Sequence, residues 1–119
     1  MKKDNIILDK SFGFAVRIVR LHKYLCRHSE RIMSKQLLRC GTSVGANVRE
    51  ALRGQSRSDF AAKMNIALKE AYESEYWLEL LHETGYLDDV QFDSIFSECR
   101  ELTNILSKIV ITTKNTEKI

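Results

Sequence analysis

No proline interrupts the 119 residues of this chain, and only five positions are glycine. Proline breaks helix interiors, and glycine weakens helices and strands alike. The scarcity of both residues therefore permits long, uninterrupted helices. Apolar residues also recur at intervals of three and four through successive segments, which is the spacing of one helix face. The sequence predicts an all-α chain.

Four helices are predicted, and their approximate bounds are residues 9–27, 33–53, 58–84 and 88–111. The connections between them are short, which favours antiparallel neighbours. We therefore expect an antiparallel up-down-up-down four-helix bundle, as a single domain over residues 1–119. The polar tail at 112–119 has no periodicity and is expected to be frayed.

The turns carry recognisable helix-capping residues. Gly54 is suited to a left-handed cap after the second helix. Either Ser56 or Ser58 is predicted to begin the third helix, which Gly85 is expected to end. The fourth helix is expected to open with a capping box that starts at Asp88.

A core stripe is predicted along each helix. In the first it consists of Leu8, Phe12, Ala15, Val19 and His22, with Val16, Ile18 and Leu25 widening the face. In the second it consists of Met33, Leu37, Cys40, Val44, Val48 and Ala51. In the third it consists of Phe60, Met64, Ala67, Ala71, Leu78 and Leu81, and in the fourth of Phe92, Ile95, Cys99, Leu102, Leu106 and Ile109. The three cysteines contain no CxxC pair, so we expect no disulfide framework.

The second helix carries small residues beside its core stripe. A glycine inside a helix costs about 1 kcal/mol relative to alanine, so the pair Gly41 and Gly45 needs a compensating role. Close approach of another helix backbone is the favoured interpretation, and a kink is the alternative. Asn47 is predicted to hydrogen-bond across a helix interface, with a ligand contact as the alternative.

The third helix is apolar around much of its circumference. Such a helix is either central in the bundle or faces another subunit, and we expect both. The residues predicted to lie at helix or subunit interfaces are Gly41, Gly45, Asn47, Glu50, Glu73, Tyr76 and Trp77.

The net charge of +3 conceals an asymmetry. Residues 1–58 contain 13 Lys and Arg against 4 Asp and Glu, whereas residues 59–119 contain 6 against 12. This division indicates a polyanionic partner, charge pairing between subunits, or both. The outer side of the first helix is basic, and either an anion-facing or a solvated surface explains it. The candidate nucleic-acid-binding residues are Arg17, Arg20, Lys23, Arg27, Arg31, Arg39, Arg49 and Arg53.

Motifs for catalysis or metal binding are weak. A di-metal bundle site needs two Glu-x-x-His motifs, and the sequence has one, Glu79 to His82. His22 and Cys26, four residues apart, are too few ligands for a metal site. We find no nucleophile elbow and no phosphate loop. The expected protein is therefore not an enzyme, and it has no cofactor, metal or small-molecule substrate. No apolar run is long enough for a membrane span, so we expect a cytoplasmic protein.

Two stretches resemble a known family. Residues 36–51 read QLLRCGTSVGANVREA, and residues 56–87 read SRSDFAAKMNIALKEAYESEYWLELLHETGYL. Together they resemble the 23S rRNA-intervening-sequence proteins, small bacterial four-helix bundles of largely undefined role. The resemblance covers about residues 10–110. On the helix-two pattern of the family lie Gln36, Leu37, Arg39, Ser43, Gly45, Ala46, Asn47 and Glu50, and on its helix-three pattern lie Glu73, Glu75, Tyr76, Trp77 and Leu78.

The resemblance implies a ring-like homopentamer. It also implies kinship with the accessory variability determinant of diversity-generating retroelements, a basic pentamer that binds nucleic acid and works with a reverse transcriptase. One stretch departs from the family pattern. Where the family has a glycine-rich turn containing arginine, this chain reads ALRGQ at residues 51–55, and we expect a helical extension there.

Two functional hypotheses follow. In the first, the protein is a homo-oligomer that binds RNA or DNA through its basic surface without sequence preference. In the second, it is a structural or adaptor oligomer that binds a protein partner. Its charges then pair between subunits, with Arg49 or Arg53 of one meeting Glu73 or Glu79 of the next.

Overall fold

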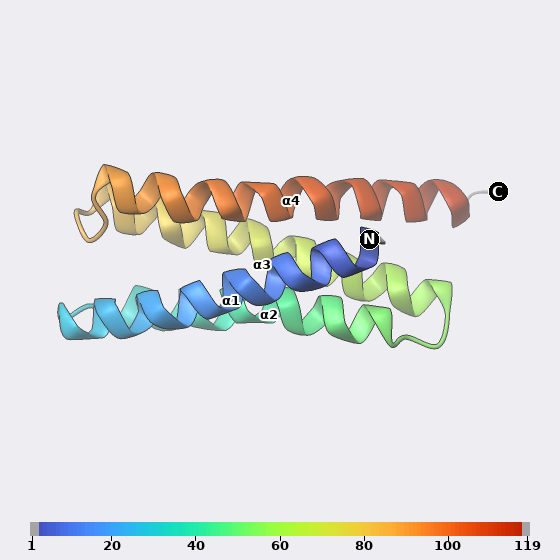
Figure 1. Cartoon of the computed structure of the whole chain (residues 1–119), viewed down its shortest axis with the longest axis horizontal. Helices are drawn as coiled ribbons and strands as arrows, with labels where there is room; N and C mark the ends of the chain where they lie inside the picture. Colours follow the sequence, from blue (N-terminus) through green and yellow to red (C-terminus); the bar gives the residue numbers. More distant parts are fainter. Residues whose placement is uncertain (1–2, 118–119) are drawn as a thin grey trace.

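The computed structural model describes residues 3–117. It contains the helices α1 (Lys3–Arg27), α2 (Ile32–Leu52), α3 (Arg57–Glu83) and α4 (Asp89–Glu117). Each helix packs on the next in the chain, and α1 also contacts α4, less extensively (Figure 1). The predicted all-α, up-down-up-down bundle is confirmed. It measures 50 × 26 × 21 Å.

Both outer helices are longer than expected. α1 already begins at Lys3, and α4 continues to Glu117, past the expected end at residue 111. The prediction of a frayed tail is therefore wrong for 112–117, whereas residues 118 and 119 lie outside the described part. Val110 is still buried in the core, and Thr113 donates a hydrogen bond to the Ile109 carbonyl at 2.7 Å. The helix thus continues beyond the buried Val110, and the Thr113 hydroxyl bonds one turn back within it.

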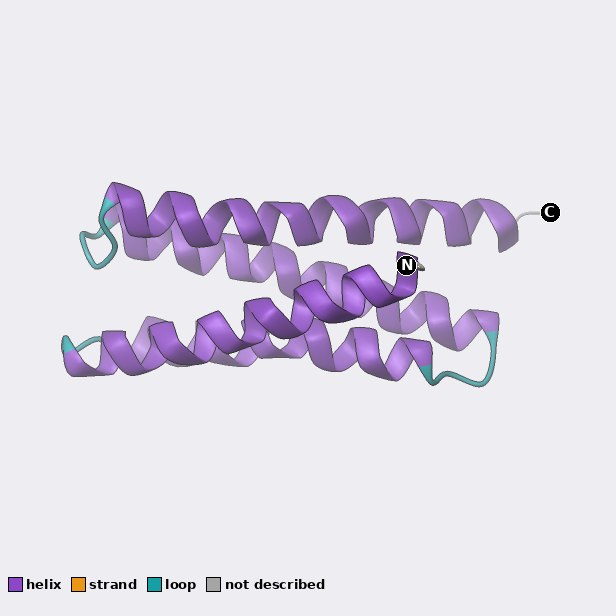
Figure 2. Ribbon diagram, in the orientation of Figure 1, coloured by secondary structure: helices purple, strands orange, loops and turns teal. Residues whose placement is uncertain are grey.

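The turns follow several of the predicted caps (Figure 2). The Ser56 hydroxyl accepts the amide of Asp59 at 3.0 Å, so Ser56 is the N-cap of α3. Gly85 takes the left-handed φ of 86° that ends α3. Asp88 and Gln91 exchange hydrogen bonds of 2.8 and 2.9 Å, which confirms the capping box.

The turn between α2 and α3 differs from its predictions. α2 ends at Leu52, so the expected helical extension over residues 51–55 is wrong beyond that residue. Arg53 is the C-cap, and Gly54 does not have a positive φ, so the left-handed cap is wrong too. Gly54 instead leaves room for the carboxylate of Asp59, which a side chain at that position would overlap.

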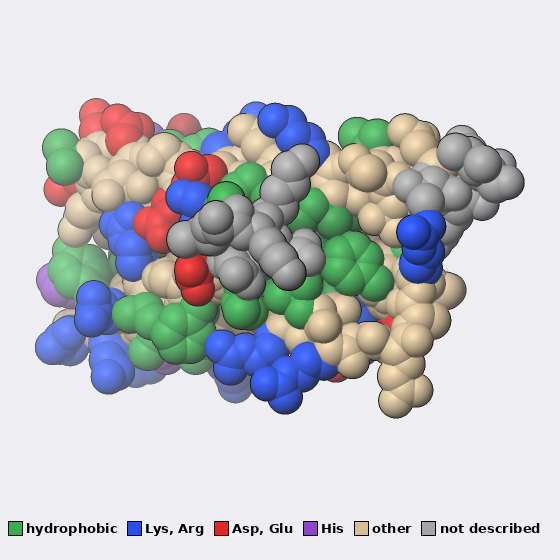
Figure 3. Space-filling view, turned by 45° about the vertical axis from the view of Figure 1, so that its right-hand side comes forward, with side chains coloured by type: hydrophobic (Ala, Val, Ile, Leu, Met, Phe, Trp, Pro, Cys, Tyr) green, Lys and Arg blue, Asp and Glu red, His purple; other side chains and the backbone are tan. Residues whose placement is uncertain are grey.

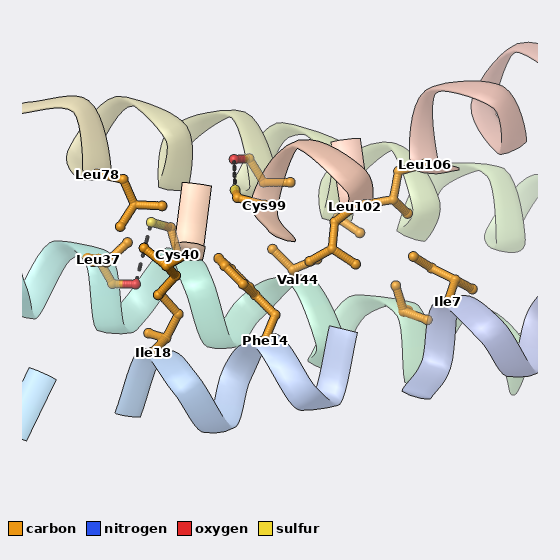
Figure 4. Packing of buried hydrophobic residues seen from close by; sticks show 14 of the residues in the cluster. Ile7, Phe14, Ile18, Leu37, Cys40, Val44, Leu78, Cys99, Leu102 and Leu106 are labelled. Carbon is orange, nitrogen blue, oxygen red and sulfur yellow. Dashed lines mark hydrogen bonds between the residues drawn. The ribbon is translucent and has the colours of Figure 1, made fainter. Parts of the chain in front are cut away.

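The core runs along the bundle axis, and all four helices contribute to it (Figure 4). Phe14 and Ile18 point inward from α1 toward α2 residues such as Val44. Cys40 and Cys99 are both buried and free, as predicted. Their thiols donate weak hydrogen bonds to the carbonyl oxygens of Leu37 and Ala71 (S···O 3.6 and 3.5 Å). The predicted stripes of α2, α3 and α4 lie in or against this core.

The predicted core face of α1 is wrong in part. Phe12 is 57% exposed and Val19 37% exposed. Ile18 and Leu25, predicted to widen that face, are fully buried, and the stripe is completed by Ile7, Ser11 and Phe14. Ser11 conceals this stripe in the sequence because it is polar, yet it is fully buried and its hydroxyl donates to the Leu8 carbonyl at 3.2 Å. A small residue is required there because Gly45 of α2 lies against it.

Candidate nucleic-acid and subunit interfaces

The charge asymmetry of the sequence becomes an asymmetry between two layers of the bundle. α1 and α2 form one layer and α3 and α4 the other. Figure 3 shows Lys and Arg side chains gathered along the lower part of the view, which the α1–α2 layer occupies. Most of the acidic side chains in this view lie above them. The predicted basic residues differ, however, in whether a carboxylate of the same chain neutralises them.

Arg17 is paired within the fold. Its guanidinium contacts the Glu98 carboxylate at 2.6 Å and donates to the Ser94 hydroxyl at 3.0 Å. Lys10 makes a parallel ion pair with Glu101 at 3.0 Å. These pairs join α1 to α4, which contact each other less extensively than the other neighbouring helices do. Arg17 therefore serves the bundle, and its charge is largely neutralised in place.

Arg39 is paired as well, on the α2–α3 side. It donates to Glu70 at 3.3 Å and also to Glu73, which accepts a further hydrogen bond from the Trp77 indole at 3.1 Å. Partial burial alone would raise the pKa of Glu73, but the hydrogen bonds from Trp77 and Arg39 together hold it below its ordinary value. The same contact with Glu73 raises the pKa of Arg39. Arg39 and Glu73 thus belong to one network within the chain.

A second group of cations remains unpaired at the end of α1 and the start of α2. Within the described residues, no carboxylate forms an ion pair with these exposed side chains, which are Arg20, Lys23, Arg27 and Arg31. Glu30 lies among them but is buried, and its carboxylate accepts the Ser34 amide at 2.8 Å. The acid thus caps α2 and does not screen the surface. We call this group the basic end.

Arg49 and Arg53 lie near the other end of α2, roughly 30 Å away by the helix rise of 1.5 Å per residue. Arg49 lies over the ring of Phe12, with 5.6 Å between its guanidinium carbon and the ring centroid. Arg53 lines an open hollow with Glu50, Asp59 and Lys63, in which Lys63 pairs with Glu50 at 3.2 Å. The candidate cations therefore do not form one continuous patch.

The small-residue seam of α2 contacts α1 of the same chain. A Cβ at Gly45 would lie 3.2 Å from the Ser11 carbonyl oxygen, so the two backbones approach closely there. A Cβ at Gly41 would lie 2.8 Å from a side-chain carbon of Ile18. Within the described part of the chain, Asn47 does not form the predicted hydrogen bond across a helix interface. Its amide donates to the carbonyl and hydroxyl of Ser43, at 2.9 and 3.0 Å, in its own helix.

The remaining predicted interface residues differ in exposure. Trp77 is half-buried and meets the ring of Tyr76 edge-on, with 5.1 Å between centroids. Tyr76 itself is 58% exposed and Tyr72 is 50% exposed. Tyr72, Glu75, Tyr76, Glu79, Leu80 and Glu83 line a shallow groove along the outside of α3. We call it the α3 groove.

The described residues contain no group of three or more His, Cys, Asp or Glu side chains able to hold a metal ion. His22 has Ser34 as its main partner, with 2.6 Å between the imidazole Nδ1 and the hydroxyl. The Cys26 sulfur lies 3.6 Å from Nε2 of the same ring. Within residues 3–117, no helix is long and apolar enough to cross a membrane.

The fold and these surfaces define a small four-helix-bundle protein with a basic end and the α3 groove. A family model for the 23S rRNA-intervening sequence proteins matches residues 3–108. The chain belongs to that family, as its sequence resemblance predicted.

The chain is also similar to a solved structure, that of a protein with unknown function from the S23 ribosomal protein family of Bacteroides thetaiotaomicron VPI-5482. The two sequences are 55% identical, and the match covers 92% of this chain and 98% of that one, with a TM-score of 0.89. A comparison with functionally curated proteins gives no match.

Proposed function

We propose that this protein is a non-enzymatic homo-oligomer, a pentamer by family resemblance, that binds RNA or DNA without sequence preference. The observation that carries the proposal is the basic end. Its four cations are exposed, and no ion pair within the described residues neutralises them. Phosphates release counterions when such side chains neutralise them, and this release drives sequence-independent binding.

Oligomerisation would strengthen a weak site of this kind. A single subunit offers a few phosphate contacts, which alone give a modest affinity at physiological salt. A ring repeats the basic end in each subunit, so one polyanion engages several copies and the later contacts become intramolecular. Of the eight candidate cations, we assign binding to Arg20, Lys23, Arg27 and Arg31. Arg17 and Arg39 are assigned to ion pairs within the bundle.

The test compares two double variants that lose equal charge. Arg27→Ala with Arg31→Ala removes half of the basic end, whereas Lys69→Ala with Lys108→Ala removes two exposed cations from the α3–α4 layer. Binding of labelled structured RNA and duplex DNA is measured at about 50 and 200 mM salt, and light scattering gives the mass in the same buffers. We expect steeply salt-dependent binding by the wild type, weakened far more in the first variant. Equal weakening in both variants, or no binding at low salt, would refute the assignment.

The second candidate function is a structural or adaptor oligomer that binds a protein partner. The exposed tyrosines of the α3 groove and the exposed Phe12 favour it, because aromatic residues are enriched at protein interfaces. This function predicts a stable oligomer that binds neither RNA nor DNA at low salt. The same measurement therefore separates the two functions.

A further inference from the structure

The α3 groove combines exposed aromatic rings with acids that lack partners. Glu79 and Glu83 line it, and neither forms an ion pair with another described residue. The two tyrosines beside them are at least half exposed. An aromatic surface next to a carboxylate suits a cationic side chain, because the ring faces and the carboxylate both attract positive charge.

Glu75 adds an independent observation to the same groove. This residue is only 7% exposed, and it lies among the groove-lining residues. One carboxylate oxygen is 3.3 Å from the Arg100 guanidinium, and the other is buried and accepts no hydrogen bond in the described structure. A buried carboxylate that is only half satisfied is costly. The groove therefore has negative charge to spare for a cation supplied from outside the chain.

The opposite layer of the bundle presents a complementary surface. A second hollow, between α1 and α2, is lined by Leu8, Phe12, Ala15, Thr42, Gly45, Ala46, Arg49 and Glu50. We call it the α1–α2 hollow. Phe12 is largely exposed at its edge, and Arg49 lies over the Phe12 ring without a carboxylate partner among the described residues. This surface thus offers a cation beside apolar and small side chains.

We infer that the α3 groove of one copy docks on the α1–α2 hollow of a second copy. Tyr76 enters the hollow beside Phe12, and Arg49 of the second copy pairs with Glu79. Tyr76 and Glu79 are three residues apart, so they lie on the same face of α3. Arg49 and Phe12 are likewise neighbours on the other surface, with 5.6 Å between the guanidinium carbon and the ring centroid. The opposite net charges of the two halves of the chain supply long-range complementarity.

The two surfaces lie on different layers, so the contact is head-to-tail. Such contacts close into rings when the rotation between neighbours allows it. The inference rests on the proposed homo-oligomer and names the residues that hold it. Of the ion pairs predicted between subunits, this contact keeps the one between Arg49 and Glu79. Glu73 is left out because it already pairs with Arg39 of its own chain.

Charge reversal tests the contact. Arg49→Glu and Glu79→Arg each place like charges across it, and the double variant restores an opposite pair. Both side chains are exposed, so each variant keeps its fold, which circular dichroism verifies. Light scattering over a dilution series reports the shift from oligomer to the 13.8 kDa monomer. We expect each single reversal to raise the concentration for half-dissociation at least about tenfold, and the double reversal to recover most of it.

Matched controls are Arg20→Glu on α1 and Asp93→Arg on α4, exposed reversals outside both surfaces. They should leave the mass unchanged. A Tyr76→Ala variant tests the aromatic contact separately and should weaken assembly without unfolding the chain. A wild type that stays monomeric would overturn the proposed oligomer together with this contact. An oligomer that survives both single reversals would overturn the contact alone.

Discussion

Gly41 offers the sharpest test of how the bundle is packed. A Cβ at this position would lie 2.8 and 3.0 Å from the two γ-carbons of Ile18 and 3.3 Å from its δ-carbon. Ile18 is fully buried, so it has little room to yield. Gly13, in the interior of α1, serves as the matched control, because a Cβ added there would have no atom within 4 Å.

The two alanine variants should change the free energy of unfolding in opposite directions. Alanine in place of glycine gains about 1 kcal/mol of helix propensity at either position. Gly13→Ala should realise most of that gain. Gly41→Ala adds a methyl group to a filled core, which costs about 1–3 kcal/mol. The expected difference in the free energy of unfolding between the variants is therefore about 1–3 kcal/mol, or roughly 3–15 °C in Tm for a domain of this size.

Urea unfolding followed by circular dichroism measures this difference. Protein concentration is held fixed, because assembly would otherwise shift the apparent stability. A double-mutant cycle with Ile18→Ala locates the cause. Ile18→Ala alone should cost about 2–5 kcal/mol, and less when Gly41→Ala is present, because the added methyl then has space. If Gly41→Ala is as stable as Gly13→Ala, or if the cycle shows no coupling, the packing argument is refuted.

Two further predictions concern ionisable groups. Burial raises the pKa of Cys40 to about 11 and raises that of Cys99 further. A disulfide reagent at mildly alkaline pH should therefore modify Cys26 fast, and Cys40 and Cys99 only after the protein is unfolded in urea. Three rapidly reacting thiols in the native protein would contradict this. The folded-state pKa of Glu73 is lowered, so its contribution to stability is present above the unfolded pKa and is lost as pH falls through the folded pKa. Trp77→Phe removes one donor to Glu73, and its unfolding free energy should fall less than that of the wild type between about pH 5 and pH 3; an equal fall would argue against this role of the indole.

The fold could be predicted because helical periodicity and capping are local. The apolar spacing and the caps at Ser56 and Gly85 depend on residues close in sequence, and the structure confirms them. The face of α1 could not be predicted in the same way. Its buried stripe passes through Ser11, whose burial depends on Gly45 in another helix. Hydrophobicity instead favoured Phe12, which the structure places at the surface.

Small polar residues explain other departures from expectation. Asn47 seemed suited to bridge two helices, but Ser43 lies one turn before it and accepts its hydrogen bonds. Ser74 and Thr103 are buried for a related reason, since each hydroxyl donates to a carbonyl of its own helix, at 2.9 Å in both cases. Such side chains satisfy themselves locally. Their local bonds let them enter the core, although Ser74 also contacts the Cys40 sulfur of α2 at 3.4 Å, and polarity alone does not reveal this.

The candidate binding site depended on contacts that no local pattern contains. Arg17 pairs with Glu98, which is 81 positions away in the sequence, and Arg39 pairs with Glu70 and Glu73 across the α2–α3 contact. These arginines face an acidic helix along the side of the bundle. Arg27 and Arg31 flank the turn between α1 and α2. The acid in this turn, Glu30, accepts a backbone amide of α2 and so caps that helix. The amount of positive charge that is free to bind a polyanion therefore depends on where each cation lies in the bundle. Composition alone overstates this free charge.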